Sequence, residues 1–188
     1  ERGYTDKDVQ VLIPQYKSQN GIDNVNVLLQ QLFNPYDTDK DEVTIGTITY
    51  RVNDKVLNLV NNTDNDIFNG DIGYIKKISK FNSKEFMVID YYGKYVTISR
   101  EDITTIKHAY AMSIHKSQGS EFDHVILPMS MEYVRMLYNK LLYTGVSRAK
   151  KTLVMCGDPK AFMMAVNNNY SKLRKTSLKE MIEYLFTN

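Results

Sequence analysis

The chain has 188 residues, of which 43% are hydrophobic and 24% are charged, so it can form one ordinary domain or one domain with a small insert. This balance excludes a disordered chain. No apolar run approaches the roughly 18 residues that a membrane span requires, and the polar residues 1–8 do not form a signal peptide. We therefore expect a soluble, cytoplasmic protein without a membrane partner. Because the sequence begins with Glu1 and not with methionine, we also expect a piece of a longer polypeptide.

The charge is nearly balanced, with 24 basic and 22 acidic side chains and a net charge of +2. Residues 1–50 contain four basic and eight acidic side chains, whereas residues 51–188 contain twenty and fourteen. The net charge alone therefore does not indicate a nucleic-acid-binding protein, and any basic face is expected in the second part of the chain.

The chain has one cysteine, Cys156, which excludes an intramolecular disulfide and a cysteine-cluster zinc site. Its apolar neighbours, residues 153–155, predict a buried strand, so we expect a buried thiol in a reducing compartment. The three histidines, His108, His115 and His124, have no metal-ligand spacing with a carboxylate or the cysteine. We therefore expect no metal bound by protein side chains.

The first elements form half of a strand-loop-helix unit. Residues 9–14 are an apolar run closed by Pro14, which predicts a buried strand followed by a loop. A helix is expected next, because apolar residues recur at helical spacing, Asp23 stands in the first turn and Asn34-Pro35 ends the segment. The apolar positions are Ile22, Val25, Leu28, Leu29 and Leu32.

The middle of the chain, about residues 44–106, is rich in Ile, Val, Thr and Tyr and is divided by turn signals. Five short strands are expected, which is enough for a small barrel and too few for a sandwich. They are residues 45–52, 55–60, 71–79, 85–91 and 95–98.

After the barrel, strands and helices alternate again, which predicts a mostly parallel sheet with right-handed crossovers. The expected strands are 109–114, 125–128 and 152–156, and the expected helices are 133–142 and 159–166. An amphipathic stretch around residues 178–185 is expected to pack as a terminal helix. The predicted fold class is thus α/β, with the parallel-sheet domain in residues 1–44 and 106–188 and the barrel inserted as residues 45–105.

Two polar loops stand out beside the predicted strands. Residues 113–123 are rich in hydrogen-bond donors and follow a strand, where parallel α/β sheets bind ligands. Residues 143–150 place Arg148 after an apolar helix, and a guanidinium suits bidentate binding of phosphate.

These segments resemble motifs of one helicase family. Residues 111–122 look like motif V of the RecD-like branch of superfamily 1, the exodeoxyribonuclease V alpha family, and residues 142–149 resemble motif VI. Residues 11–26 resemble the motif IV region, and residues 54–56 with 68–73 match the start of its SH3-like insert. Four matches in the right order are highly specific, and they cover about residues 9–165.

The resemblance implies a RecA-like parallel sheet of the P-loop NTPase type, the second such domain (2A), with an SH3-like 2B barrel inserted. It further implies a bacterial, ATP-dependent 5′–3′ DNA helicase that acts in recombination and repair. Its partners would be single-stranded DNA, ATP and an N-terminal RecA-like domain that binds most of the ATP and Mg²⁺. The sequence does not indicate whether nuclease or repair partners associate.

The resemblance also assigns roles to residues around ATP. Arg148 would be the arginine finger on the γ-phosphate, which would make it catalytic together with Gln118 and Glu121. Gly119 and Glu121 would line the nucleotide, and Gln15 and Lys17 of motif IV would complete the ATP site. The alternatives are that Arg148 only caps a helix and that Glu121 is only solvated.

A second group of residues would contact DNA by the same resemblance: Ser113, His115, Lys116 and Thr144. His115 could instead be an ordinary loop histidine. The barrel's tyrosines and phenylalanines interleave with lysines, so they could stack on bases, although half-buried strand residues explain them more simply.

Two departures from the family pattern matter. Lys17 stands where the family often has arginine, and lysine lacks the bidentate fork. No phosphate-binding Gly-x-x-x-x-Gly-Lys-[Ser/Thr] sequence occurs, so these residues alone are expected not to hydrolyse ATP.

Two other functions stay open at this point. The chain could be a stand-alone module that binds nucleic acid or protein without ATPase activity, or a regulatory paralogue that has lost its ATPase half. The joint presence of the 115–121 loop and Arg148 favours the helicase, because a scaffold needs neither.

Overall fold

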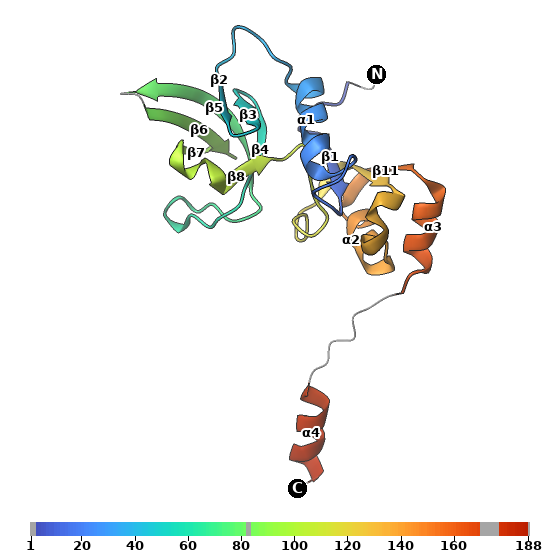
Figure 1. Cartoon of the computed structure of the whole chain (residues 1–188). Coiled ribbons are helices and arrows are strands. Elements are labelled where there is room, and N and C mark those ends of the chain that lie inside the picture. The colour runs from blue at the N-terminus through green and yellow to red at the C-terminus, as the bar shows by residue number, and fades with distance from the viewer. Residues whose placement is uncertain (1–2, 82–83, 170–176, 188) are drawn as a thin grey trace.

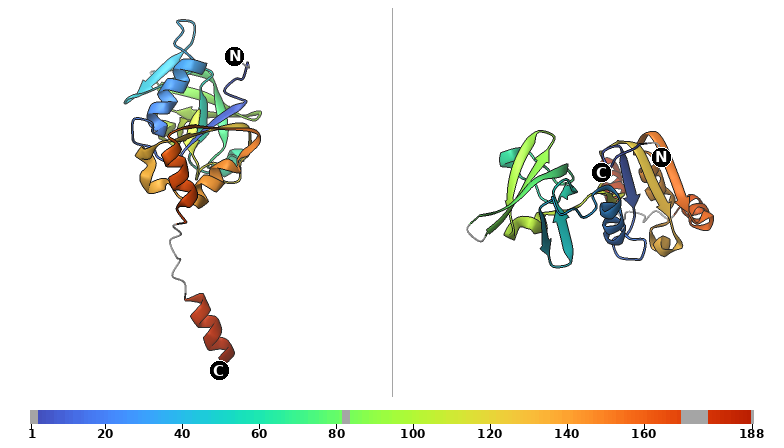
Figure 2. Two further views of the ribbon diagram at one scale, coloured as in Figure 1. Left: turned by 90° about the vertical axis from the view of Figure 1, so that its right-hand side faces the viewer. Right: turned by 90° about the horizontal axis from the view of Figure 1, so that it is seen from above.

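The computed structural model describes residues 3–81, 84–169 and 177–187. Figure 1 and Figure 2 show an α/β part, called here the body, beside a unit built mainly of strands, called the insert. None of the described helices is both long and apolar enough to cross a membrane.

The body is built on a four-stranded sheet in the order β11-β10-β1-β9, and every pair in it is parallel. The strands are β1 (Val9–Ile13), β9 (Ala111–Ser113), β10 (Phe122–Met129) and β11 (Ala149–Gly157). In their apolar runs Leu12, Ile13 and Val125 are fully buried. Because all four strands run in the same direction, the loops before them gather where the strands begin, called here the amino edge of the sheet. The loops after them gather where the strands end, called here the carboxyl edge.

The helices of the body are α1 (Ile22–Phe33), α2 (Asn139–Val146) and α3 (Pro159–Asn167). α1 packs against β9, where Asn26 pairs with both the amide and the carbonyl of Ala111. α2 and α3 pack against β10, and α2 also contacts β11. These contacts leave the β11 edge of the sheet comparatively open.

The insert contains two sheets among its described residues, a β2-β3 hairpin and a five-stranded sheet in the order β7-β6-β5-β4-β8. Its strands are β2 (Glu42–Ile45), β3 (Ile48–Arg51), β4 (Lys55–Asn58), β5 (Ile72–Phe81), β6 (Lys84–Tyr91), β7 (Lys94–Ser99) and β8 (Ile106–His108), with two short 3-10 helices, η1 (Thr63–Asn65) and η2 (Glu101–Thr105). The strands thus begin three residues before the expected boundary at 45 and end three residues after the one at 105.

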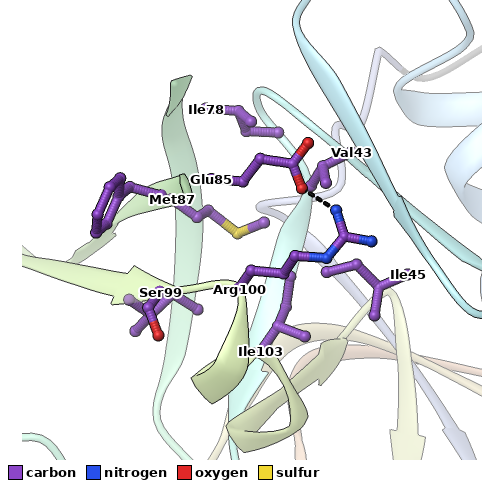
Figure 3. Close-up of a pocket in the computed structure, with 10 residues that line it drawn as sticks. Val43, Ile45, Ile78, Glu85, Met87, Ser99, Arg100 and Ile103 are labelled. Atoms are coloured by element: carbon purple, nitrogen blue, oxygen red, sulfur yellow. Dashed lines mark hydrogen bonds and ion pairs between the residues drawn. The ribbon is translucent and has the colours of Figure 1, made fainter. Parts of the chain in front are cut away.

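A separate apolar core fills the insert, with Val56, Ile75 and Ile89 fully buried. Figure 3 shows one end of this core, where the apolar side chains converge and an ion pair between Arg100 and Glu85 closes the rim. The remaining space is about 10 Å³, which is hardly room for one water molecule. This part of the insert is packed core and not a ligand site.

The helix expected over residues 133–142 is wrong in part. The chain forms a 3-10 helix, η3 (Met131–Met136), and then breaks before α2. The buried Tyr133 donates its hydroxyl to the carbonyl of Asn20 at 2.6 Å, and the break also lets Leu137 and Leu141 enter the core. Tertiary packing has therefore overridden the helical period.

Two further expectations about the second part of the body fail. Cys156 is exposed, because β11 is an edge strand and even its apolar Val154 is 47% exposed. The amphipathic α4 (Leu178–Thr187) forms, but Figure 1 shows it apart from the body and the insert, with Met181 and Leu185 exposed. Its expected packing is thus not seen.

Candidate nucleotide and nucleic-acid sites

The loop over residues 114–121 connects the two edges of the body sheet. It leaves the carboxyl end of β9 and returns to the amino end of β10. Ser117, which is fully buried, fixes it by donating its hydroxyl to the carbonyl of Ile114 at 2.8 Å. Gly119 has φ +86°, a left-handed backbone conformation that favours glycine, and no other part of the chain fills the space where a side chain would start.

The start of this loop, which lies at the carboxyl ends of the strands, presents a histidine and a lysine. His115 is exposed and Lys116 is half-exposed. Ser113 is only 5% exposed, and its hydroxyl accepts the Lys116 amide at 3.2 Å. The structure therefore offers His115 and Lys116 to a ligand, whereas Ser113 is a buried turn residue and not a surface phosphate contact.

Lys116 also links the loop to the insert. Its Nζ donates to Oδ1 of Asn69 at 2.6 Å. The sequence placed Asn69 only in the segment that matches the start of the SH3-like insert, and nothing in it indicated this long-range partner. The position of the candidate DNA-binding lysine thus depends on an insert loop.

The motif IV residues lie after β1, at the carboxyl edge of the sheet. Gln15 donates its Nε2 to the Lys17 carbonyl at 2.8 Å, and Lys17 is exposed. Next to them, Lys107 lies 5.0 Å above the centre of the Tyr16 ring. Tyr16 and Lys107 both line a groove of about 600 Å³ between α1 and the β2-β3 hairpin.

Arg148 lies at the opposite, amino edge, where three of its donors are used inside the chain. Nη1 donates to the Ser120 carbonyl at 3.0 Å, Nε to the Thr144 carbonyl at 3.2 Å and Nη2 to the Ser147 hydroxyl at 3.0 Å. A guanidinium has five N–H donors. One donor on each terminal nitrogen therefore remains for a bidentate ligand such as phosphate.

The hydrogen bonds of Thr144 hold Arg148 in place and are made within the chain. Its hydroxyl donates to the Lys140 carbonyl at 2.8 Å, within α2. Its carbonyl accepts from both Arg148 and the hydroxyl of Ser147. The DNA-contact role expected for Thr144 does not match these bonds.

Glu121 is brought to the same edge as Arg148. The flanking Phe122 amide donates to the Arg148 carbonyl at 2.8 Å. The exposed Glu121 carboxylate lies 3.4 Å from Lys150 Nζ. Gln118 is exposed one turn earlier in the same loop. Of the residues expected around ATP, the structure therefore brings together Glu121 and Arg148.

The other half of the expected ATP site is not brought to this edge. Gln15 and Lys17 follow β1, whereas Arg148 precedes β11, and the two strands run in the same direction. β1 alone has five residues, which span about 16 Å. Neither motif IV side chain can therefore share a phosphate with Arg148 within this chain.

Further charged residues at the amino edge were missed by the sequence reasoning. Lys151 donates to the Asp123 carboxylate at 2.7 Å, and this hydrogen bond lowers the pKa of Asp123 and raises the pKa of Lys151. Asp123 and Glu121 also line a polar cavity of about 400 Å³ that the insert completes with Tyr92. Tyr92 is 87% exposed and has φ +54°.

The tyrosines of the insert range from buried to exposed. Tyr50 and Tyr91 are buried in the insert core, and burial raises the pKa of Tyr50 to about 12. Tyr92 and Tyr95 are exposed. Stacking on bases is therefore open only to a minority of the tyrosines that the sequence presented.

The donors at the amino edge suit a nucleotide better than a bare metal ion. Arg148 and Lys150 supply positive charge, and Glu121 can accept from a ribose hydroxyl. In the part of the chain that the structure describes, no three His, Cys, Asp or Glu side chains are grouped to hold a metal ion.

Two family models match the chain. Residues 25–91 match the ATP-dependent RecD-like DNA helicase SH3 domain, and residues 108–156 match the UvrD-like helicase C-terminal domain. The first match covers most of α1 and most of the insert. The second covers the Ser113–Glu121 segment, Arg148 and most of β11.

Curated relatives agree with these matches. The ATP-dependent RecD2 DNA helicase of Deinococcus radiodurans is 31% identical over 174 residues, which is 93% of this chain and 23% of that protein. The RecBCD enzyme subunit RecD of Haemophilus influenzae is 33% identical over 129 residues, 65% of this chain and 18% of its own length. The chain thus spans about a quarter or less of these relatives.

Solved structures support the fold. The Candida albicans Pif1 helicase matches with a TM-score of 0.58 and 15% identity over 99% of this chain and 50% of that chain. A Bacteroides Pif1 in complex with ADP-AlF3 and ssDNA matches with a TM-score of 0.55 and 16% identity over 98% and 46%. Together with the family models and the relatives, this fold shows that the chain belongs to the RecD-like superfamily 1 helicases and comprises the second RecA-like domain with its SH3-like insert.

Proposed function

We propose that the chain supplies the γ-phosphate side of the ATP site and part of the single-stranded DNA path of a 5′–3′ DNA helicase. One observation carries the proposal: the loop over 114–121 presents the exposed His115 and the half-exposed Lys116 near its start and ends beside Arg148. One short segment thus joins a candidate DNA contact to a candidate arginine finger.

Arg148 is the finger in this proposal because its anchored guanidinium keeps one free donor on each terminal nitrogen. As ATP is hydrolysed, these two donors stabilise charge on the γ-phosphate. Glu121 accepts from the ribose, and the exposed Gln118 orients the attacking water. ATP and Mg²⁺ are held mainly by a first RecA-like domain that presents its P-loop to this edge.

On the DNA side, His115 and Lys116 bind phosphates, which gives affinity without base specificity. Lys17 belongs with them, because it lies at the carboxyl edge and not beside Arg148. The division of the chain into body, insert and body remains part of this proposal, with the expected bounds of 45 and 105 extended to the start of β2 at residue 42 and the end of β8 at residue 108. A bacterial, cytoplasmic location is also part of it. The 5′–3′ polarity and the action in recombination and repair are supported by the family resemblance alone.

The test is DNA-stimulated ATP hydrolysis by a polypeptide in which a P-loop domain precedes this chain. Arg148→Ala should lower turnover on the order of 10³-fold, with nucleotide affinity retained. Lys116→Ala should instead raise the DNA concentration needed for half-stimulation. The control is Arg135→Ala, which removes an exposed arginine of η3. Unchanged turnover in Arg148→Ala would exclude the finger.

A further inference from the structure

A buried carboxylate lies where the insert meets the body. Asp54 is fully buried, between β3 and β4, and five donors reach its two oxygens. Oδ1 accepts from Asn34 Nδ2 at 2.7 Å and the Tyr110 hydroxyl at 2.9 Å, and Oδ2 accepts from Gln30 Nε2 at 2.6 Å, the Arg51 amide at 2.8 Å and His108 Nε2 at 3.0 Å. We call these residues the Asp54 cluster.

The donors come from both places where the chain crosses between the two parts. Gln30 and Asn34 lie at the end of α1, just before the chain leaves the body. His108 and Tyr110 lie at the end of β8 and directly after it, where the chain returns to β9. One side chain therefore binds the outgoing and the returning segments together.

The charge on Asp54 is needed for this arrangement. Burial alone would raise the pKa of Asp54, but hydrogen bonds from His108, Asn34 and the Arg51 amide outweigh it and hold the pKa below its ordinary value. An ionised carboxylate accepts at both oxygens, whereas a protonated acid or an amide must donate at one of them. Only the carboxylate satisfies all five donors.

The cluster is connected to the candidate DNA loop. From Asp54 the chain continues into β4, whose last residue, Asn58, is buried and donates its side chain to the carbonyls of Val60 and Phe68. This fixes the following loop, in which Asn69 accepts from Lys116 at 2.6 Å.

We propose that Asp54 is a positioning residue that locks the insert to the body in one orientation and so sets the place of Lys116. The lock itself depends only on the structure of the joint. Its consequence for DNA rests on the function proposed above for Lys116. The two steps therefore require separate tests.

The orientation is tested by the spin-label distance between the insert and the body. Labels are placed at Thr97→Cys on β7 and Lys160→Cys in α3, both exposed, in a Cys156→Ser background. The unmodified joint should give one narrow distance distribution, and Asp54→Asn should give a broad or shifted one. Asp90→Asn is the matched control, because Asp90 caps the β6-β7 turn and pairs with Lys76 and is not a member of the Asp54 cluster.

An Asp54→Asn distribution as narrow as that of the parent, and at the same distance, would overturn the lock. Should Asp54→Asn fail to fold, Tyr110→Phe decides, because it removes one donor of the cluster and hardly changes volume. A broadened distribution supports the lock, and an unchanged one overturns it.

The effect on DNA is tested by a double-mutant cycle with a fluorescent oligothymidylate. Asp54→Asn and Lys116→Ala should each weaken binding by a similar factor, on the order of threefold to tenfold. The double variant should be no weaker than Lys116→Ala alone. A double variant whose loss of affinity equals the product of the two single losses would show that Asp54 does not act through Lys116. Absence of binding by the parent chain would refute the proposed DNA contact and leave the distance result unaffected.

Discussion

The Asp54 cluster and the surroundings of Arg148 differ in how fully their hydrogen bonds are used. Asp54 is fully buried and accepts from five donors, all within the chain. Arg148 is half-buried and spends three of its five donors on internal partners. Both are charged groups at a junction of segments, but only the second keeps capacity for a ligand.

Asp54 is therefore a charge that holds segments of the fold together, whereas Arg148 is a charge that can still bind a ligand. Removing one partner from a satisfied buried cluster leaves several groups unpaired, and stability falls. Removing a partly exposed group with spare donors costs little stability, since water takes its place. Stability and function measured on the same variants therefore tell the two kinds of charge apart.

The largest expected effect on stability is that of Asp54→Asn. The amide cannot satisfy all five donors, so the free energy of unfolding should fall by about 3–5 kcal/mol, measured by urea denaturation. Asp90→Asn should cost about 1 kcal/mol or less. Equal losses in the two variants would remove the basis of the comparison.

Lys55 is a further buried charge, and its partners compensate it only in part. Its Nζ donates to the carbonyls of Asp6 and Val9, and burial lowers the pKa of Lys55 from 10.5 to about 8. Between these values the folded chain binds fewer protons than the unfolded chain, so stability should rise as the pH rises. The expected gain from pH 8 to pH 10 is on the order of 2 kcal/mol.

The measurement for Lys55 is the midpoint of urea unfolding as a function of pH. Lys55→Gln should remove the rise. The pH range ends near pH 10, because burial raises the pKa of Tyr50 to about 12 in the folded chain. Above pH 10 such tyrosines lose their protons more readily in the unfolded chain, so the stability of the folded chain falls. A flat profile for the parent chain between pH 8 and pH 10 would contradict the prediction.

Tyr110→Phe should have a smaller effect than Asp54→Asn. It removes one of the five donors and leaves the carboxylate with four, so unfolding should become easier by about 1–2 kcal/mol. Thermal or urea unfolding checks this. A loss as large as that of Asp54→Asn would mean that the hydroxyl, and not the carboxylate, dominates the joint.

Arg148→Ala should have the smallest effect on stability. Its partners Ser120, Thr144 and Ser147 are half-exposed, so water can replace the guanidinium and the expected loss is about 1 kcal/mol or less. The same unfolding experiment checks it. A loss near that of Asp54→Asn would place Arg148 among the structural charges.

Much of the fold follows from the sequence, because strand and helix periods are local. The runs at 9–14 and 159–166 became β1 and α3 with nearly the expected ends. Cys156 shows the limit: an apolar run predicts a strand but not whether that strand has a neighbour on both sides, and β11 does not.

The candidate site was also predicted only in part, because a local sequence pattern does not show which distant residues the fold brings together. Glu121 and Arg148 could be paired only through the family motifs, and the structure places them at one edge. Lys17 was grouped with them by motif, whereas strand direction puts it at the other edge. Residues 54–56 were matched to the start of the SH3-like insert, but the sequence did not indicate the Asp54 cluster, because four of its five donors come from distant positions and are joined only by the fold.

The most direct test of the central claim is the affinity for ADP with aluminium fluoride, a mimic of the transferring phosphoryl group, compared with ADP alone. It uses a polypeptide in which a P-loop domain precedes this chain. The proposed arginine finger predicts that Arg148→Ala binds ADP like the parent but loses the added affinity for the mimic, while Arg135→Ala keeps both. Undiminished binding of the mimic by Arg148→Ala would contradict the proposal.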